Sequence, residues 1–584
     1  MMMMNTMQMG MALLVIATAI HDRLLATESA EKPASLVQGP VDLALTFPSP
    51  MDGSDQPYRL YLPSAYDGVR AVPMLIALHG TSGNQNTYFD DAGYRSGIYK
   101  REAEKRGIAV LCPSGGDALG LPTEWRGVGE LHVLAAIDDV CRRFRIDLGR
   151  IICSGQSMGG TGTTYLCCRY PDIFAAGIPL ASNYGHLSLV TNLRHVPMFY
   201  VQGKKDRPYY AETGPIPLTR EMQRLGYQSA LWMIADANHN TMDVSTERVL
   251  DWALQQRLVR HPRHVSYRAY LPLHGRAYWT EIQKIERIGW FAGIEARIED
   301  DNRIAVTLTN ASAAALRPEP ELLRLDATIR VTVNGRGVFA GPCRADQEIR
   351  LLAKGKDWIA TIGSREVLSR HRPSPHLIGT VVGRPPNWDG DAETSLGSWK
   401  ADAMRDATGA EIAICNKGHF RGIPLKARQS VDVIGLVNWL RNGETVLAMF
   451  TMRGAELLGI IEDNIRDDAE EYRFFIQVSG CRYRFDRSRP KGQRIVSSDI
   501  NPAREYSIVC EYHSLARTDT MYLAGRYGKI PFQRLELTAL STAWRYIEKF
   551  GGNIEGKLDC RVDGMEKNTN PAAPQEFIKT GARK

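Results

Sequence analysis

The sequence predicts an α/β fold in which a mostly parallel sheet, flanked by helices, occupies residues 45–260 and two smaller modules follow. Three observations predict it. In residues 45–260, short apolar runs alternate with helical stretches, a pattern typical of parallel sheets. In residues 262–365, closely spaced β-rich runs indicate a small all-β module. In residues 374–530, helical and β-rich runs alternate again, which favours a mixed α/β module.

The expected strands of the first half are short runs rich in apolar residues. They are Tyr58–Leu62, Pro73–Leu78, Ile108–Cys112, Ile151–Cys153, Met198–Val201 and Ala230–Ile234. The helices expected between them are Ile98–Arg106, Glu130–Phe144, one helix directly after Gly160, Thr219–Leu225 and Ser245–Gln256. Because Pro73–Leu78 is apolar throughout, we expect this strand to be buried on both faces of the sheet.

The all-β module contains strand candidates at Val265–Tyr270, Ile304–Leu308, Ile329–Val333 and Val338–Phe339. Asn334-Gly335 separates the last two. Both residues tolerate the positive φ angles that a type I′ turn requires, so we expect a tight hairpin there.

Composition limits the classes of function. The chain has 584 residues, enough for about three or four domains at roughly 100–200 residues each. Its 44% hydrophobic and 23% charged residues are ordinary for a globular protein. A net charge of +7 is too small for this length to suggest nucleic-acid binding. Ten cysteines do not indicate a disulfide-built scaffold.

The two ends of the sequence differ from the rest. The apolar run Met11–Ile20 has the length of a signal-peptide core, and we expect residues 1–30 to be a signal peptide and the protein to be secreted or periplasmic. Residues 1–10 contain no Lys or Arg, which keeps a cytoplasmic leader open as the alternative. No apolar run reaches the roughly 18 residues of a membrane span. The polar residues 565–584 are expected to be disordered.

The segment Gly155–Gly160 predicts the nucleophile. It matches G-x-S-x-G and lies directly after an expected strand and before an expected helix, the context in which this motif forms a sharp turn. Such a turn holds its central residue in strained backbone angles and lifts the hydroxyl clear of the sheet. We therefore expect Ser157 to be the catalytic nucleophile.

A serine nucleophile needs a base and a residue that orients the base. Asp206 follows the expected strand Met198–Val201, and His239 follows the expected strand Ala230–Ile234. The order Ser, Asp, His is that of α/β-hydrolases. Asp236 is the rival acid, but one short loop can hardly place both it and His239 correctly. The predicted triad is therefore Ser157, Asp206 and His239.

The developing oxyanion needs two backbone N–H donors. We expect the first from Met158, directly after the nucleophile, and the second from Thr81, with Ser82 as the alternative. This chemistry requires no cofactor and no metal ion, and none is expected.

The motifs of the first half resemble α/β-hydrolase esterases of the polyhydroxybutyrate-depolymerase and feruloyl-esterase-like branch, which is related to prolyl oligopeptidases. They are Tyr58–Pro63, Leu75–Gly80, Gly155–Gly160, Gly203–Asp206 and Asn238-His239. The resemblance implies hydrolysis of small-molecule or polymer esters through an acyl-serine. It also implies that the loop around Trp125 lines the substrate cleft, although a structural role for this aromatic is equally open.

Residues 393–520 resemble the C-terminal domain of 5′-nucleotidases, which binds the nucleoside part of the substrate. The resemblance implies that Asn416 and Arg421 contact a nucleotide or nucleoside. In the family's base-stacking loop this chain reads Trp439-Leu-Arg-Asn442, with leucine in the place of the usual ring, so the neighbouring Trp439 is the candidate substitute. The metal-bearing phosphatase domain has no counterpart, because D-x-H, G-N-H-[DE] and G-H-x-H are all missing from the sequence.

The sequence therefore favours a serine carboxylesterase. One alternative is a nucleotide-binding protein or 5′-nucleotidase-type hydrolase that works through the C-terminal module. A second is a serine peptidase of the prolyl-oligopeptidase type, and a third is an inactive binding protein. No nucleic acid is expected among the partners.

Overall fold

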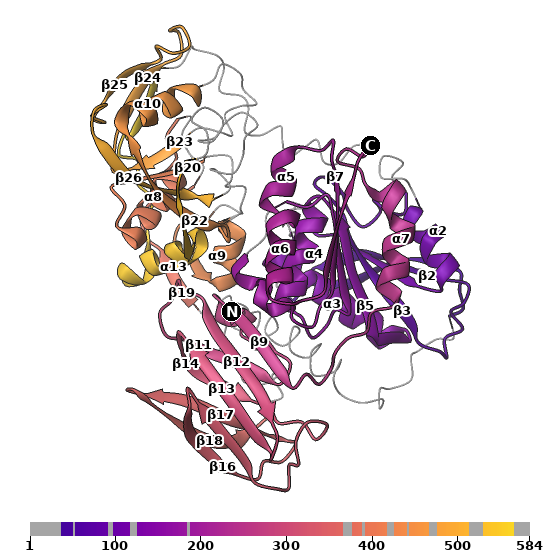
Figure 1. Cartoon of the computed structure of the whole chain (residues 1–584). Helices are drawn as coiled ribbons and strands as arrows, with labels where there is room; N and C mark the ends of the chain where they lie inside the picture. The colour runs from indigo at the N-terminus through magenta and orange to yellow at the C-terminus, as the bar shows by residue number, and fades with distance from the viewer. Residues whose placement is uncertain are drawn as a thin grey trace, which may run out of the picture.

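The computed structural model describes three modules arranged around a common centre (Figure 1). The described residues are 37–50, 53–90, 97–116, 125–183, 187–365, 377–387, 392–416, 425–440, 443–465, 476–512 and 530–565. The signal peptide expected at residues 1–30 and all but the first residue of the tail expected at 565–584 lie outside them. None of the helices within these ranges combines the length and apolarity that crossing a bilayer requires.

The first module is built on an eight-stranded sheet of order β1-β2-β4-β3-β5-β6-β7-β8. Its strands are β1 (Val41–Pro48), β2 (Asp55–Leu62), β3 (Val72–Leu78), β4 (Ala109–Pro113), β5 (Ile146–Gln156), β6 (Ala176–Leu180), β7 (Met198–Gly203) and β8 (Ser229–Ile234). The pairs β1–β2 and β2–β4 are antiparallel, and the pairs from β4 to β8 are parallel. The mostly parallel sheet predicted from the alternating pattern is confirmed.

Helices cover both faces of this sheet. They are α2 (Ile98–Arg106), α3 (Val128–Arg143), α4 (Met158–Arg169), α5 (Pro208–Thr213), α6 (Pro215–Arg224), α7 (Met242–Leu254) and the 3₁₀ helix η2 (Leu187–Leu193). Core residues of α2 and α7 form one cluster with one face of the sheet. Those of α3, α4, η2 and α6 cluster with the opposite face (Figure 1). All seven residues of β3 are buried, as the apolar run predicts.

The second module packs two five-stranded sheets around one core cluster. Its strands are β9 (His264–Ala269), β10 (Arg276–Ala277), β11 (Thr280–Ile285), β12 (Ala292–Glu299), β13 (Arg303–Thr309), β14 (Ala311–Leu316), β15 (Ile329–Val333), β16 (Arg336–Gly341), β17 (Gln347–Lys354) and β18 (Asp357–Ser364), and η3 (Pro272–His274) is its 3₁₀ turn. Asn334 and Gly335 join β15 to β16 with φ angles of 49° and 81°. The predicted hairpin is therefore present.

The third module mixes three small sheets with four helices in its described residues. Its strands are β19 (Leu377–Val381), β20 (Ile412–Asn416), β21 (Ser430–Asp432), β22 (Val446–Arg453), β23 (Ile476–Ser479), β24 (Tyr483–Asp486), β25 (Ile495–Ser498), β26 (Glu505–Glu511), β27 (Gln533–Thr538), β28 (Asn553–Ile554) and β29 (Val562–Met565). Its helices are α8 (Ser395–Thr408), α9 (Val433–Trp439), α10 (Gly454–Asp463) and α13 (Ala539–Lys549). β27 and α13 pack into this module, so its fold continues beyond the expected boundary at residue 530.

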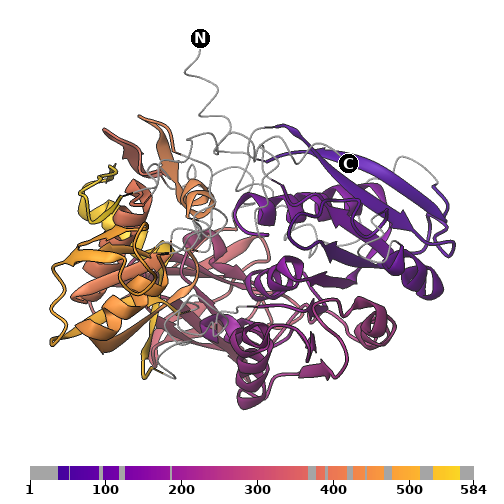
Figure 2. The same cartoon turned by 90° about the horizontal axis from the view of Figure 1, so that it is seen from above.

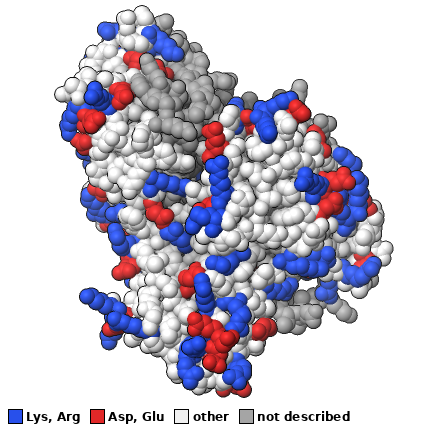
Figure 3. Space-filling model, viewed as in Figure 1, with Lys and Arg blue, Asp and Glu red and all other residues white. Residues whose placement is uncertain are grey.

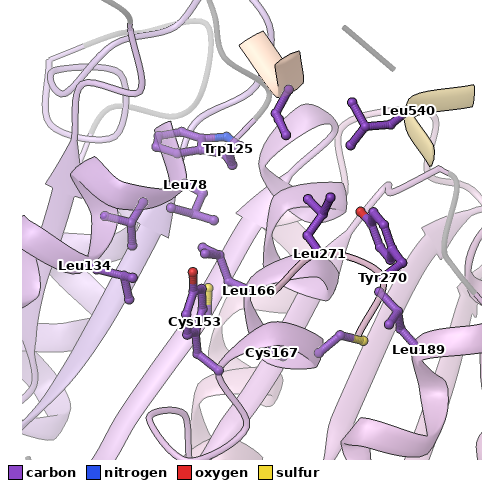
Figure 4. Packing of buried hydrophobic residues seen from close by; sticks show 14 of the residues in the cluster. Leu78, Trp125, Leu134, Cys153, Leu166, Cys167, Leu189, Tyr270, Leu271 and Leu540 are labelled. Atoms are coloured by element: carbon purple, nitrogen blue, oxygen red, sulfur yellow. The ribbon is translucent and has the colours of Figure 1, made fainter. Parts of the chain in front are cut away.

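The first and third modules share a hydrophobic core. One cluster of buried residues contains side chains from both, including Trp125 and Leu166 of the first module and Leu540 of the third. Figure 4 shows Leu540 facing Tyr270 and Leu271 at this junction. The two modules also lie side by side when the molecule is turned (Figure 2). They are therefore joined by packing, as well as by the chain that connects them.

A buried group of charges crosses the same junction. Arg169, at the end of α4, makes ion pairs with Glu130 of α3 and with Glu444, which precedes β22 in the third module. His274 of η3 lies 2.7 Å from Glu130, and the Tyr270 hydroxyl donates to Glu444. Burial alone would raise the pKa of Glu130, but Arg169 and His274 lower it to about 2. The carboxylate thus stays ionised and paired with Arg169 at neutral pH.

We expect Arg169→Met to lower the free energy of unfolding by about 3–5 kcal/mol, because it removes the cation that the two buried carboxylates of Glu130 and Glu444 share. Urea denaturation measures the change. Arg142→Met is the matched control, since Arg142 is 48% exposed and its ion pairs with Asp138 and Asp139 each contribute about 1 kcal/mol or less. Equal effects of the two substitutions would contradict the prediction.

Charged side chains on the visible surface are mixed in sign. On the face shown in Figure 3, acidic and basic side chains are interspersed over all three modules. This distribution agrees with the small net charge of +7.

Candidate active site

Ser157 lies in the sharp turn that the motif predicts. β5 ends at Gln156 and α4 begins at Met158, so a single residue joins strand to helix. Ser157 has φ 58° and ψ −116°, a conformation that costs a non-glycine residue about 1–3 kcal/mol. Its N–H donates to the Leu180 carbonyl at 2.9 Å, which fixes the turn to the end of β6.

The glycines of the motif permit the close approach of β3. A Cβ added at Gly155 would lie 2.5 Å from the Leu78 carbonyl oxygen, and one at Gly159 would lie 1.9 Å from it. Leu78 ends β3, directly before His79-Gly80-Thr81. The Ser157 turn and the segment after β3 are therefore in direct contact only because these two positions carry no side chain.

Asp206 and His239 are hydrogen-bonded to each other. His239 Nδ1 lies 2.7 Å from Asp206 Oδ2, and the Asp206 side chain is only 4% exposed. Gln202 Nε2 donates to the same oxygen at 2.8 Å, and the Arg207 N–H donates to Oδ1 at 2.8 Å. Because the carboxylate accepts from three donors, His239 is oriented with Nδ1 as the donor and Nε2 as the atom left to accept a proton.

Asp236, the rival acid, has a different position. Its carboxylate is 91% exposed and pairs with Lys205 at 3.0 Å. The histidine contact thus belongs to Asp206, as the spacing of the strands predicts.

The loop that carries His239 lies against both β5 and β7. Gln156 Nε2, from the residue before Ser157, donates to the His239 carbonyl at 2.9 Å. A Cβ added at Gly203, the last residue of β7, would lie 2.1 Å from the Asn238 carbonyl oxygen. Tyr210 of α5 stacks on the His239 imidazole, with ring centroids 5.1 Å apart and planes at 26°. Three neighbouring elements thus fix the position of the histidine.

A surface cavity of about 410 Å³ opens at this place. It is lined by Gln156, Lys205, Asp206, Arg207, Asn238, His239 and Asn240. The His239 side chain is 40% exposed, so its imidazole is accessible from the solvent side. The imidazole can therefore be reached from this cavity.

The residues expected in the oxyanion hole, Met158 and Thr81, follow the ends of β5 and β3. Met158 is the first residue of α4, where helix geometry leaves the backbone N–H without an intrahelical partner. Thr81 is exposed in the turn after β3, and Ser82 there has φ 68°. His79 is buried: desolvation lowers its pKa, while hydrogen bonds to the Gly80 and Ser114 carbonyls act in the opposite direction. This burial and the two backbone contacts indicate a structural role for His79.

Sequence reasoning missed Gln156, Gln202 and Tyr210 as supporting residues. Gln202 precedes Asp206 by four positions and Tyr210 follows it by four, but neither spacing has a signature in a single sequence. Trp125, left open between cleft and core, is fully buried, which favours the structural role.

The residues expected to contact a nucleotide in the third module are only partly described by the structure. The side chain of Asn416 and the whole of Arg421 lie outside the described residues. Trp439 is 1% exposed, donates from its indole N–H to the Pro386 carbonyl at 3.3 Å, and packs on Trp399 with centroids 5.0 Å apart. This placement favours a core role for Trp439 over base stacking. Within the described ranges, no cluster of His, Cys, Asp and Glu side chains has the arrangement of a metal site.

Comparisons with known families match two parts of the chain. Residues 49–280 match the model of the putative esterase family, and residues 378–524 match that of the 5′-nucleotidase C-terminal domain. Both resemblances drawn from the motifs are confirmed: the chain joins an esterase-type α/β-hydrolase region to a 5′-nucleotidase C-terminal domain. Its first half is thus that of a hydrolase. A comparison with curated proteins gave no match.

Solved structures similar to the chain include a thermostable esterase, with 22% identity and a TM-score of 0.31, over 37% of this chain and 63% of that one. The chain thus spans less than two thirds of that esterase. S-formylglutathione hydrolase from Staphylococcus aureus has 20% identity and a TM-score of 0.29, over 37% and 98%. A 5′-nucleotidase precursor from Thermus thermophilus has 13% identity and a TM-score of 0.30, over 65% and 93%.

Proposed function

We propose that the chain is a serine carboxylic-ester hydrolase that works through an acyl-enzyme, with Ser157, His239 and Asp206 as its triad. The observation that carries the proposal is the 2.7 Å contact between His239 and Asp206, beside a strained turn that ends in Ser157. The esterase family match over residues 49–280 supports the same class of reaction.

The reaction begins with attack of the Ser157 Oγ on the ester carbonyl carbon, while His239 Nε2 accepts the hydroxyl proton. The tetrahedral intermediate collapses, the bond to the alcohol oxygen breaks, and His239 returns the proton to the leaving alcohol. Water then attacks the acyl-serine while His239 accepts its proton; the bond to Ser157 breaks as His239 returns this proton to the serine oxygen, and the carboxylic acid leaves. Asp206 holds the imidazole and stabilises its charged form in both steps.

The negative oxygen that forms in each step needs preorganised donors. The N–H of Met158 at the start of α4 and the N–H of Thr81 after β3 are assigned to this role. Both lie on segments that meet at Gly159 and Leu78, where a Cβ has no room. The hole therefore depends on how the end of β3 is held.

Esters are favoured over peptides as substrates, because the matching family is an esterase family. The peptidase alternative is tested by comparing an aryl ester with the aryl amide of the same acyl group. Faster turnover of the amide would favour a peptidase.

Export of the protein through a signal peptide in residues 1–30 belongs to the same proposal, and the N-terminal sequence of the mature protein tests it.

Covalent labelling tests the nucleophile directly. We expect a fluorophosphonate probe to modify the native full-length protein at one site, and peptide mapping to place the label on Ser157. Heat-denatured protein should not react, because labelling requires the folded triad. A label on another serine, or none in the folded protein, would overturn the proposal.

A further inference from the structure

Trp125 contacts the segment assigned to the oxyanion hole. Its indole N–H donates to the His79 carbonyl at 3.1 Å, and its ring meets the His79 imidazole edge-on with centroids 4.8 Å apart. His79 directly precedes Gly80 and Thr81. Because Trp125 is fully buried, this contact is shielded from water and fixes the peptide that leads into the oxyanion segment.

The backbone of Trp125 is strained. Its φ is 60°, which is uncommon for a bulky residue and costs about 1–3 kcal/mol. Its ring fills the space beside Gly115 and Gly162, where an added Cβ would lie 2.5 and 2.6 Å from ring or side-chain atoms of Trp125. A conformation of this kind persists only where the residues around it hold it.

The residues that follow Trp125 are held by the third module. The Val128 N–H donates to Asn438 Oδ1 of α9 at 3.2 Å, and Arg126 Nε lies 3.3 Å from Glu444 Oε2. Gly127 has φ 53°, and a Cβ there would lie 2.5 Å from Asn438 Oδ1. Val128 is the first residue of α3, whose N-terminus has no capping side chain of its own. Asn438 therefore supplies an acceptor for a helix donor that would otherwise have no intrahelical partner.

We propose that Asn438 is a positioning residue of the ester-hydrolysing site, acting through Trp125. Asn438 and Glu444 hold the turn 126–128, the turn holds the Trp125 indole, and the indole fixes the His79 carbonyl and with it the oxyanion segment. The third module thus completes the hydrolase site as a structural part of it. This inference rests on the proposed function.

The first test replaces Asn438 in the full-length chain. We expect Asn438→Ala to lower kcat for a short-chain aryl ester by about tenfold or more, since small misplacements near the reacting atoms have effects of up to about 10²-fold. KM should change little, because the oxyanion forms only in the transition state. Asn438→Leu, which keeps the volume but removes the acceptor, should behave in the same way if the alanine variant does not fold.

Two further variants separate positioning from stability. Asn438→Asp retains an acceptor for Val128 N–H and should restore most of kcat. Asn464→Ala is the matched control: Asn464 is a buried amide in the same module, 6% exposed, and it donates to the Ile460 carbonyl at 2.8 Å. It should leave kcat unchanged even if it lowers the thermal midpoint.

A double-mutant cycle tests the route through the indole. Trp125→Phe keeps a ring but removes the N–H that holds the His79 carbonyl, so we expect a loss in kcat similar to that of Asn438→Ala. If Asn438 acts through Trp125, the double variant should lose little more than either single one. Independent effects would instead multiply.

The outcomes distinguish this inference from the proposed function. An active wild type with full kcat in folded Asn438→Ala, or multiplicative losses in the cycle, overturns the inference and leaves the esterase intact. A wild type that neither hydrolyses the ester nor reacts with a fluorophosphonate overturns both.

Discussion

Ser157→Ala should abolish ester hydrolysis, with kcat for a short-chain aryl ester falling by about five orders of magnitude or more. The reason is chemical, because no other hydroxyl is held in the strained turn between β5 and α4. The fold should persist, since the substitution removes one oxygen atom from a residue whose backbone hydrogen bond to Leu180 remains. Initial rates measured on the folded variant give the ratio.

The control for this experiment is Ser188→Ala. Ser188 lies in η2 and its hydroxyl donates to Glu536 at 3.4 Å, so it belongs to the contact between modules and not to the triad. Its kcat should match that of the wild type. Turnover by Ser157→Ala at more than about one hundredth of the wild-type rate would refute the assignment of the nucleophile.

The second large effect is expected from Asp206→Asn, which should lower kcat by about 10³- to 10⁴-fold while KM stays within a few-fold. An asparagine presents either an amide N–H or a neutral oxygen to His239 Nδ1. Since Gln202 Nε2 and Arg207 N–H already donate to the carboxylate, the amide cannot satisfy all of its neighbours. The imidazole then loses the orientation that makes Nε2 a base.

Asp236→Asn is the control, because it makes the same chemical change in the loop that leads to His239. Asp236 is 91% exposed and its contact with Lys205 is at the surface, so kcat should change by less than about threefold. A larger loss in Asp236→Asn than in Asp206→Asn would reverse the assignment of the acid. Steady-state kinetics of both variants on one substrate decide between them.

Strands with strong apolar patterns could be predicted from the sequence. β3, β4 and β7 are fully buried, and each appears as an apolar run. β6 could not be predicted, because Ala176–Leu180 contains a glycine and a proline, which are rare in strand patterns. Its glycine is set by packing: a Cβ at Gly177 would lie 2.6 Å from the Met198 sulfur. Such a requirement depends on the neighbouring strand, and no local pattern shows it.

Some residues of the candidate site could also be predicted from the sequence, and others could not. Ser157, Asp206 and His239 could be proposed because each follows a strand in an order typical of one fold. Gln202 and Tyr210 could not, since their role depends on where side chains point after folding. The contact between Asn438 and Val128 joins residues 310 positions apart, and neither segment carries a sequence pattern that predicts it. Sequence alone therefore left the third module as a separate binding unit.

The buried ion group around Arg169 makes the first module dependent on the third when the protein is truncated. A fragment that ends before β19 lacks Glu444 and Leu540. Arg169 then keeps only one of its two carboxylate partners, and the apolar surface around Leu271 is exposed to solvent. Truncated proteins would therefore aggregate during expression. Their inactivity would not test whether Ser157, Asp206 and His239 catalyse ester hydrolysis. Experiments that exchange domains between related proteins should therefore transfer the first and third modules together.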